Sequence, residues 1–196
     1  MGSEFELKYK ATPEALTEIQ KALQGEPQHF RMRTTYYDTA GGDLSARRWT
    51  LRQRMENETS VCTLKTPGID GARGEFETEC HSIEAAIPEL CKLSGQSELA
   101  ALAAGGLRQV CGAAFRRVAV TVPLEHATAE VALDEGFLLG GGRQLPLCEL
   151  EVELKSGDRG EVIDFARDLA ARFGLEPECR SKFRRALDLA GGNGHG

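Results

Sequence analysis

Charged and apolar side chains alternate along several short segments of the chain, and their spacing is suited to chemistry on phosphates and metal ions. Glu4-Phe5-Glu6-Leu7-Lys8, residues 73–79 and residues 149–155 each place acidic side chains two residues apart, on one face of an extended chain. Leu51-Arg52-Gln53-Arg54 places two arginines together in the same way. Paired carboxylates offer the oxygen ligands that Mg²⁺ or Mn²⁺ prefers, whereas arginine and lysine bind phosphate oxygens.

The concentration of charged residues on one face of each of these strands has two structural explanations. An open antiparallel sheet with one wet face accounts for any single strand of this kind. Like charges two residues apart repel one another unless a positive group lies between them. If the sheet curls into a barrel instead, the charged faces turn inward and must be cross-paired, hydrated or filled by a ligand. A cavity with both signs of charge suits a metal-polyphosphate complex.

The elements that must position these side chains follow from the same periodicity. Period-two alternation predicts strands over 5–9, 30–37, 48–55, 60–66, 73–79, 115–123, 129–134 and 149–155. Helices are predicted from Thr12-Pro13 onward, over 82–92 and 97–104, and over 161–173 where Gly174 ends the last one. The fold class predicted is α+β, a largely antiparallel sheet with helices packed outside it.

Composition narrows the function classes. The chain has 196 residues, 41% of them apolar, and a net charge of −6, which suits one globular domain and disfavours binding to a nucleic-acid polymer. No apolar run approaches the roughly 20 residues that cross a bilayer, and no secretory signal begins the chain. We therefore expect a cytoplasmic protein with no membrane partner. The six cysteines are scattered, so reduced thiols are expected rather than disulfides or a zinc site.

The order of these motifs resembles the CYTH superfamily of triphosphate tunnel metalloenzymes, most closely its bacterial inorganic triphosphatases. The matching segments, in chain order, are Glu4–Lys8, Tyr36–Thr39, Leu51–Arg54, Lys65, Arg73–Glu77, Arg116, Leu133-Asp134, Cys148–Glu153, and Ser181-Lys182 with Arg185. The resemblance implies a closed antiparallel β-barrel of about eight strands, a triphosphate tunnel, with helices outside.

The resemblance also implies roles for individual residues. The catalytic set is Lys8, Arg52, Arg54, Lys65, Glu75 and Glu77. Triphosphate is expected to bind Lys8, Arg52, Arg54, Lys65, Arg73, Arg116, Lys182 and Arg185. Mg²⁺ or Mn²⁺ is expected to bind Glu4, Glu6, Asp134, Glu149 and Glu151. For each acid taken singly, the alternative is an ion pair with an arginine of the tunnel.

The activity that the resemblance implies is metal-dependent hydrolysis of tripolyphosphate to pyrophosphate and phosphate. Thiamine triphosphatase and class IV adenylate cyclase are alternatives on the same tunnel, and a non-catalytic polyphosphate-binding module is an alternative of another class. Residues 1–188 are expected to form the tunnel domain and 189–196 a glycine-rich flexible tail. In some similar proteins a CHAD domain follows. A homodimer stays open, because family members often dimerise although no exposed apolar stripe requires it here.

Overall fold

The described chain is built on one antiparallel sheet. The structure, a computed structural model, describes residues 2–68 and 73–191. Ten strands in this part follow the order β1-β6-β5-β4-β3-β7-β8-β9-β2-β10. The strands are β1 Gly2–Glu4, β2 Glu6–Lys10, β3 Gln28–Thr39, β4 Thr50–Glu56, β5 Thr59–Pro67, β6 Arg73–Glu79, β7 Leu107–Pro123, β8 Ala127–Gly140, β9 Arg143–Gly157 and β10 Glu176–Pro177. The helices are α1 Pro13–Ala22, α2 Asp43–Ala46, α3 Ile83–Ser94, α4 Glu98–Ala104, α5 Arg159–Phe173 and α6 Lys182–Leu189.

The N-terminal segment brings the two ends of the sheet together. β1 pairs with β6 and β2 pairs with β9, yet only Phe5 separates β1 from β2 in the chain. The Phe5 carbonyl also accepts a hydrogen bond of 3.0 Å from the Leu154 N–H. The antiparallel, barrel-like architecture is confirmed, but within residues 2–68 and 73–191 the ladder of strand pairs does not close into the ring that a closed barrel implies. The covalent chain through Phe5 joins its edges.

The positions of the predicted strands are confirmed, and β7, β8 and β9 extend furthest beyond their predicted bounds. β7 begins at Leu107 rather than near residue 115, and β8 and β9 extend to a hairpin around Gly141-Gly142. Both glycines have positive φ, at 57° and 73°, which the tight turn requires. The extra length lies beyond the alternating segments, where periodicity carries no signal.

Local sequence determines where the helices begin and end. Thr12, Ser82 and Asp158 each cap a helix N-terminus by accepting a backbone N–H with the side chain. Gly174 ends α5 in the left-handed conformation, with φ 63°. The four predicted helices are therefore confirmed, whereas α2 and α6 have no counterpart among the predictions.

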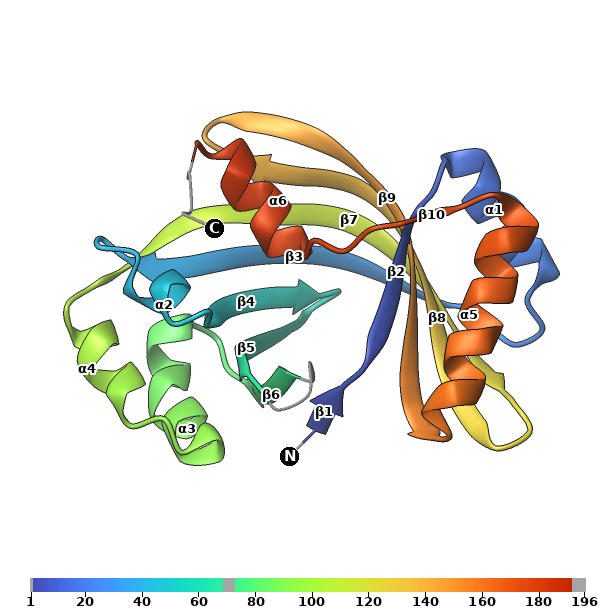
Figure 1. Cartoon of the computed structure of the whole chain (residues 1–196). Helices are drawn as coiled ribbons and strands as arrows, with labels where there is room; N and C mark the ends of the chain where they lie inside the picture. The colour runs from blue at the N-terminus through green and yellow to red at the C-terminus, as the bar shows by residue number, and fades with distance from the viewer. Residues whose placement is uncertain (1, 69–72, 192–196) are drawn as a thin grey trace.

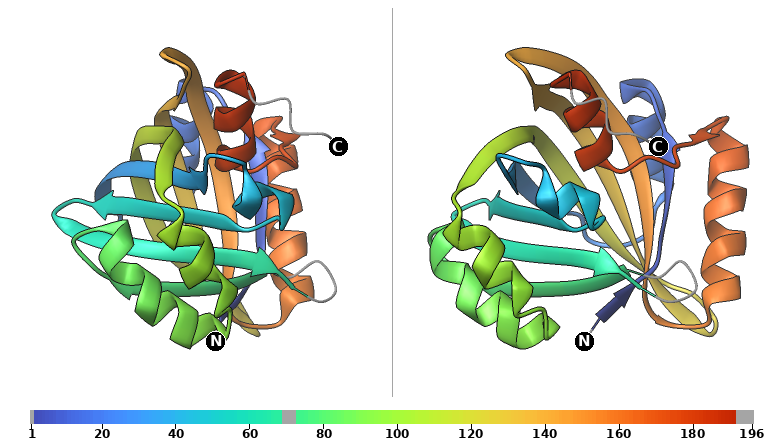
Figure 2. Two further views of the ribbon diagram at one scale, coloured as in Figure 1. Left: turned by 90° about the vertical axis from the view of Figure 1, so that its left-hand side faces the viewer. Right: turned by 60° about the vertical axis from the view of Figure 1, so that its left-hand side comes forward.

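The helices do not all lie outside the sheet, and the expectation that they do is wrong for α6. The outer face packs under α1 and α5 at one flank and under α3 and α4 at the other (Figures 1 and 2). α6 instead packs with Tyr36, Phe115, Leu138 and Leu147, which share the face of the sheet that carries the charged residues. Helix α6 therefore closes the inner side of the curved sheet at one end.

Helix α6 comes this close to β8 because residue 140 is a glycine. A Cβ at Gly140 would lie 2.3 Å from the Ala186 carbonyl oxygen and 2.8 Å from the Ala190 nitrogen, both backbone atoms of the α6 region. We therefore expect Gly140→Ala to displace α6 and lower the free energy of unfolding by about 1–3 kcal/mol. Urea unfolding measures this change. Gly105→Ala is the control for replacement of a glycine, because Gly105 has an ordinary φ of −73° and the nearest atom to its added Cβ lies at 3.4 Å.

The remaining expectations about the chain concern thiols, membrane segments and the tail. The six cysteines, which all lie in the described ranges, are free. In residues 2–68 and 73–191 no helix has the length and apolar character of a membrane span. Of the expected tail, α6 includes residue 189, and 192–196 lie outside the described residues.

Candidate active site

A cavity of about 250 Å³ lies on the inner face of the sheet, and charged side chains dominate its lining. Its acids and bases come from strands on both sides of the curved sheet and from the first turn of α6. The charged residues that line it are Glu6, Lys8, Arg52, Arg54, Glu56, Lys65, Glu75, Glu77, Arg117, Glu130, Glu151, Glu153, Lys155 and Lys182. The cavity thus brings together all six predicted catalytic residues.

Strands β4, β5 and β6 form one wall of this cavity. Glu75 pairs with Arg52 at 3.1 Å and with Lys65 at 3.0 Å. Glu77 is more exposed; it accepts a hydrogen bond of 2.8 Å from the Thr63 hydroxyl and lies 3.4 Å from Arg52. Glu75 and Glu77 therefore form ion pairs with bases of this wall, which is the alternative to metal binding for an acid at this position.

Arg54 is another buried base of this wall. Its side chain is 11% exposed, and its Nε donates to the Thr34 hydroxyl at 3.2 Å. Burial lowers the pKa of Arg54, and the neighbouring Arg52 and Arg117 lower it further. Its acidic contact is Glu56, at 3.6 Å. Three guanidinium groups close together form a strongly positive region, which attracts an anion.

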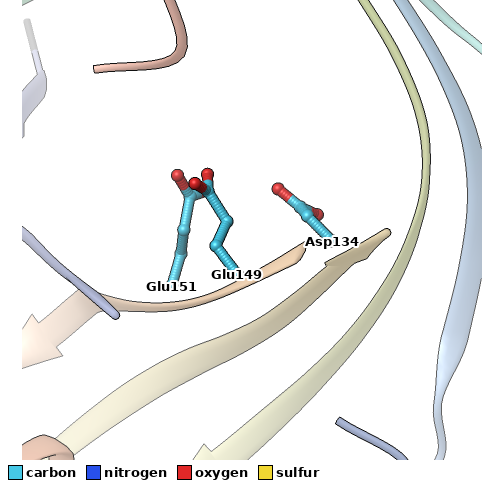
Figure 3. Close-up of side chains that lie close together, drawn as sticks. All are labelled: Asp134, Glu149 and Glu151. Carbon is cyan, nitrogen blue, oxygen red and sulfur yellow. The ribbon is translucent and has the colours of Figure 1, made fainter. Parts of the chain in front are cut away.

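Three buried carboxylates converge on the opposite side, where Glu151 lines the cavity and Asp134 and Glu149 next to it are fully buried. Figure 3 shows them facing one another, Asp134 on β8 and the two glutamates on the adjacent β9. One oxygen of each lies within 4.8 Å of the others. The Lys182 ammonium lies 2.8 Å from Asp134 and 2.7 Å from Glu151, and it also contacts Glu149. We call these three residues the acidic trio.

Two arginines complete the charge balance of the acidic trio. Arg117 donates two hydrogen bonds of 2.7 Å to Asp134 and a third to Glu151, while Arg185 contacts Glu149. Three bases thus face three acids. Buried charges need this pairing, because a single uncompensated charge costs several kcal/mol.

The pKa values at the acidic trio reflect this pairing. Burial opposes the charged form of Lys182, but the three carboxylates outweigh it and raise the pKa of Lys182 well above its usual value. Burial would also raise the pKa of Glu151, yet Lys182 and Arg117 outweigh it and hold that pKa well below its usual range. Lys182 and Glu151 therefore form an ion pair at neutral pH.

The start of α6 places Lys182 at the trio. Ser181 caps the helix, its hydroxyl accepting the Arg184 N–H at 3.1 Å. Ser181 also lines the cavity, next to Lys182. Lys182 lines the cavity, whereas Arg185, one turn later, contacts Glu149 and is only 9% exposed.

The structure contradicts the predicted position of Arg116. Arg116 is exposed on the outer face, beside His29 and Glu135, and the next residue, Arg117, points into the cavity. Successive side chains of a strand point to opposite faces of the sheet, so Arg116 and Arg117 cannot both point into the cavity. The signal that identifies Arg117 is its pairing directly opposite Asp134 in the β7–β8 register.

The N-terminal strand supplies Glu6 and Lys8 to the cavity. Their side chains are 2.8 Å apart, and burial and the charge of Glu6 shift the pKa of Lys8 in opposite directions, with a net rise. Glu6 faces Glu153 across the β2–β9 pair, and Glu153 faces Glu130 across the β8–β9 pair. The predicted roles of Glu4 and Arg73 depend on side chains that lie outside the described ones.

The acidic trio fits a divalent cation in its donor chemistry. Its ligand atoms are carboxylate oxygens, which suit Mg²⁺ or Mn²⁺. A positive group, the Lys182 ammonium, already lies among the three carboxylates. Because Lys182, Arg117 and Arg185 already neutralise the three carboxylates, a divalent cation bound there would take the place of the Lys182 ammonium.

Comparisons with known proteins agree with this architecture. The chain is 29% identical over 195 residues to the inorganic triphosphatase of Haemophilus influenzae; the match covers 96% of this chain and 55% of that protein. The chain thus spans about half the length of this curated relative.

Solved structures show the same fold. A protein of Pyrococcus horikoshii OT3 has a TM-score of 0.66 at 22% identity, with 95% of this chain and 99% of that chain covered. A Hippeastrum protein, described as a putative adenylyl cyclase with a dominant triphosphatase activity, has a TM-score of 0.67 at 20% identity, with 96% of each chain covered. The CYTH domain model matches residues 2–187. Because this match covers nearly the whole chain, the chain belongs to the CYTH family.

Proposed function

We propose that this chain is an inorganic triphosphatase, which hydrolyses tripolyphosphate to pyrophosphate and phosphate with Mg²⁺ or Mn²⁺. The observation that carries the proposal is that each of the two opposite walls of one cavity carries both acidic and basic side chains. The bases are paired with acids throughout. A metal-triphosphate complex brings a counter-charge for each set, so its entry can replace these ion pairs without leaving a buried charge uncompensated.

The basic residues of the cavity bind and orient the substrate in this proposal. Lys8, Arg52, Arg54 and Lys65 neutralise the charge on the phosphate oxygens, together with Arg117 and Lys182 from the opposite wall. Glu75 and Glu77 keep Arg52 and Lys65 in the orientation that meets the phosphates. Arg73 belongs to the proposed substrate-binding set on the resemblance, and Arg185 acts by holding Glu149.

The proposed metal ligands are the acidic trio together with Glu6 and Glu4. A divalent cation bound there would polarise the phosphate oxygens and supply positive charge where negative charge develops. The protein holds the carboxylates in place through Arg117 and Arg185. This fixed arrangement lowers the cost of reorganising the site as the reaction proceeds.

The relatives support triphosphate chemistry over other uses of the fold. The Haemophilus protein is named an inorganic triphosphatase, and the Hippeastrum protein is described as having a dominant triphosphatase activity. The cavity is lined almost entirely by charged side chains, with Tyr36 and Phe183 as its aromatic members. A chain of phosphates satisfies such a lining more completely than a nucleotide base does.

One assay tests the proposal. The purified chain is given tripolyphosphate, ATP or thiamine triphosphate with Mg²⁺ or Mn²⁺, and phosphate and cyclic AMP are both measured. We expect phosphate release from tripolyphosphate that depends on the metal. Arg52→Met should lower this turnover at least 100-fold, because a preorganised charged donor at the phosphates is lost. Arg47→Met, outside the cavity and bonded to Glu98, should leave it within about twofold.

Two outcomes would contradict the proposal. Formation of cyclic AMP as the main product would assign the cavity to a cyclase. Tight binding of tripolyphosphate without turnover of any substrate would favour a polyphosphate-binding module.

A further inference from the structure

Glu178 is a buried carboxylate that lies outside the cavity lining. It follows β10 and is 6% exposed. Its backbone N–H donates to the carbonyl of Lys8 on β2 at 2.9 Å. In Figure 1 the chain crosses from β10 over β2 to α6 in this region. Glu178 therefore begins the short connection that brings Lys182 to the acidic trio.

The carboxylate of Glu178 binds the connection and the helix that follows it. One oxygen accepts the Arg180 backbone N–H at 3.0 Å and its Nε at 3.2 Å, and the other accepts the Arg180 Nη2 at 3.2 Å. The second oxygen also lies 3.9 Å from Nη1 of Arg185, in α6. Burial raises the pKa of Glu178, but these hydrogen bonds and the two arginine charges outweigh it and lower the pKa to about 2. The group is ionised at neutral pH.

These contacts join the start of α6 to β2. Arg185 contacts Glu149 through Nη2 and faces Glu178 with Nη1. Lys182 lies one turn before Arg185, so an orientation imposed on Arg185 also restricts the rotation of the helix that carries Lys182. The backbone bond to Lys8 fixes the same connection to β2.

We propose that Glu178 is a positioning residue, which latches the first turn of α6 to β2 and thereby holds the Lys182 ammonium in the cavity. The effect on substrate rests on the proposed function, in which Lys182 binds the phosphates. The latch itself is a property of α6 and can be measured without any substrate.

The first experiment measures tripolyphosphate binding by calorimetry in the presence of Mg²⁺. We expect Glu178→Gln, which keeps the shape and removes the charge, to weaken binding about tenfold, and Glu178→Asp to recover part of the loss. Glu176→Gln is the matched control, because Glu176 is an exposed acid two residues earlier, in β10, whose only close base among the described residues is Lys10, at 3.9 Å. It should bind within about twofold of the unchanged chain.

A double-mutant cycle separates positioning from general destabilisation. In a Lys182→Met background, where no ammonium remains to be placed, Glu178→Gln should weaken binding by less than about twofold. An equal loss in both backgrounds would overturn the proposal.

Hydrogen exchange tests the latch independently of substrate. The amides of α6 should exchange faster in Glu178→Gln than in Glu176→Gln, while those of α5 stay unchanged. If the α6 amides exchange equally in both variants, the latch is refuted. This measurement needs no Lys182→Met variant, so it tests the latch even if Lys182→Met does not fold. Absence of tripolyphosphate binding by the unchanged chain, together with faster exchange in Glu178→Gln, would refute the proposed function and leave the latch standing.

Discussion

Arg117→Met will lower kcat/KM for tripolyphosphate by about 10²–10³-fold, whereas Arg116→Met will change it by less than about twofold. The two arginines are neighbours on β7, with equal charge and nearly equal sequence context. Arg117 points into the cavity and bonds Asp134 and Glu151, whereas Arg116 is exposed on the outer face. The pair therefore tests which face of the strand performs the chemistry. Initial rates of phosphate release measure it.

Loss of Arg117 also affects stability, and the experiment must separate the two effects. Asp134 loses two hydrogen bonds to Arg117, and truncation of one partner in a buried ion pair costs about 3–5 kcal/mol. Rates should therefore be taken at a temperature where circular dichroism shows Arg117→Met folded. Arg117→Lys keeps the charge and loses the two-pronged contact, so it should recover part of the stability. Equal losses of kcat/KM in Arg116→Met and Arg117→Met would show that the inner face of β7 has no special role.

Asp134→Asn should have the second large effect, on both stability and metal binding. Asp134 is fully buried and balances Arg117 and Lys182. Without divalent cations, the substitution should lower the free energy of unfolding by about 3–5 kcal/mol, because two buried bases lose an acidic partner. It should also weaken Mn²⁺ binding by at least about tenfold, since one carboxylate ligand becomes an amide. Urea unfolding and electron paramagnetic resonance of Mn²⁺ measure these changes.

The control for Asp134→Asn is the next residue of β8. Glu135 is exposed on the outer face, so Glu135→Gln should change stability by less than about 0.5 kcal/mol and leave Mn²⁺ binding unchanged. Unaltered Mn²⁺ affinity in Asp134→Asn would remove Asp134 from the proposed ligands. The acidic trio would then be only the structural counterpart of Lys182, Arg117 and Arg185.

The short-range patterns of the sequence predicted most of the strands and the main helices. The alternation in 5–9 and 149–155 identified the strands that supply Glu6, Lys8 and Glu151 to the cavity. Thr12-Pro13 and Gly174 marked helix ends that the structure confirms. These predictions succeeded because a period of two residues and a helix cap depend only on neighbours in the chain.

Helix α6 escaped prediction for a physical reason. Its apolar residues Phe183, Ala186 and Leu187 are spaced as on one face of a helix and pack into the inner core, but the helix has only eight residues. The bases that share this short segment are typical of a solvated face, so the local pattern gives only a weak signal. Lys182 and Arg185 are buried nevertheless, because Asp134, Glu149 and Glu151 compensate their charge. Those partners lie 31 or more positions away in the chain, beyond the reach of any local pattern.

The sequence by itself determined that acids and bases would line one face of an antiparallel sheet, and its motif order determined the family. Only the tertiary structure decided which charges meet. Strand register placed Arg117 rather than Arg116 opposite Asp134, and the passage through Phe5 joined the sheet edges. A glycine at position 140 let α6 approach and bring Lys182 to the acidic trio. Alternation defines the face on which a side chain lies, whereas the partner it finds depends on register and curvature, which long-range packing determines.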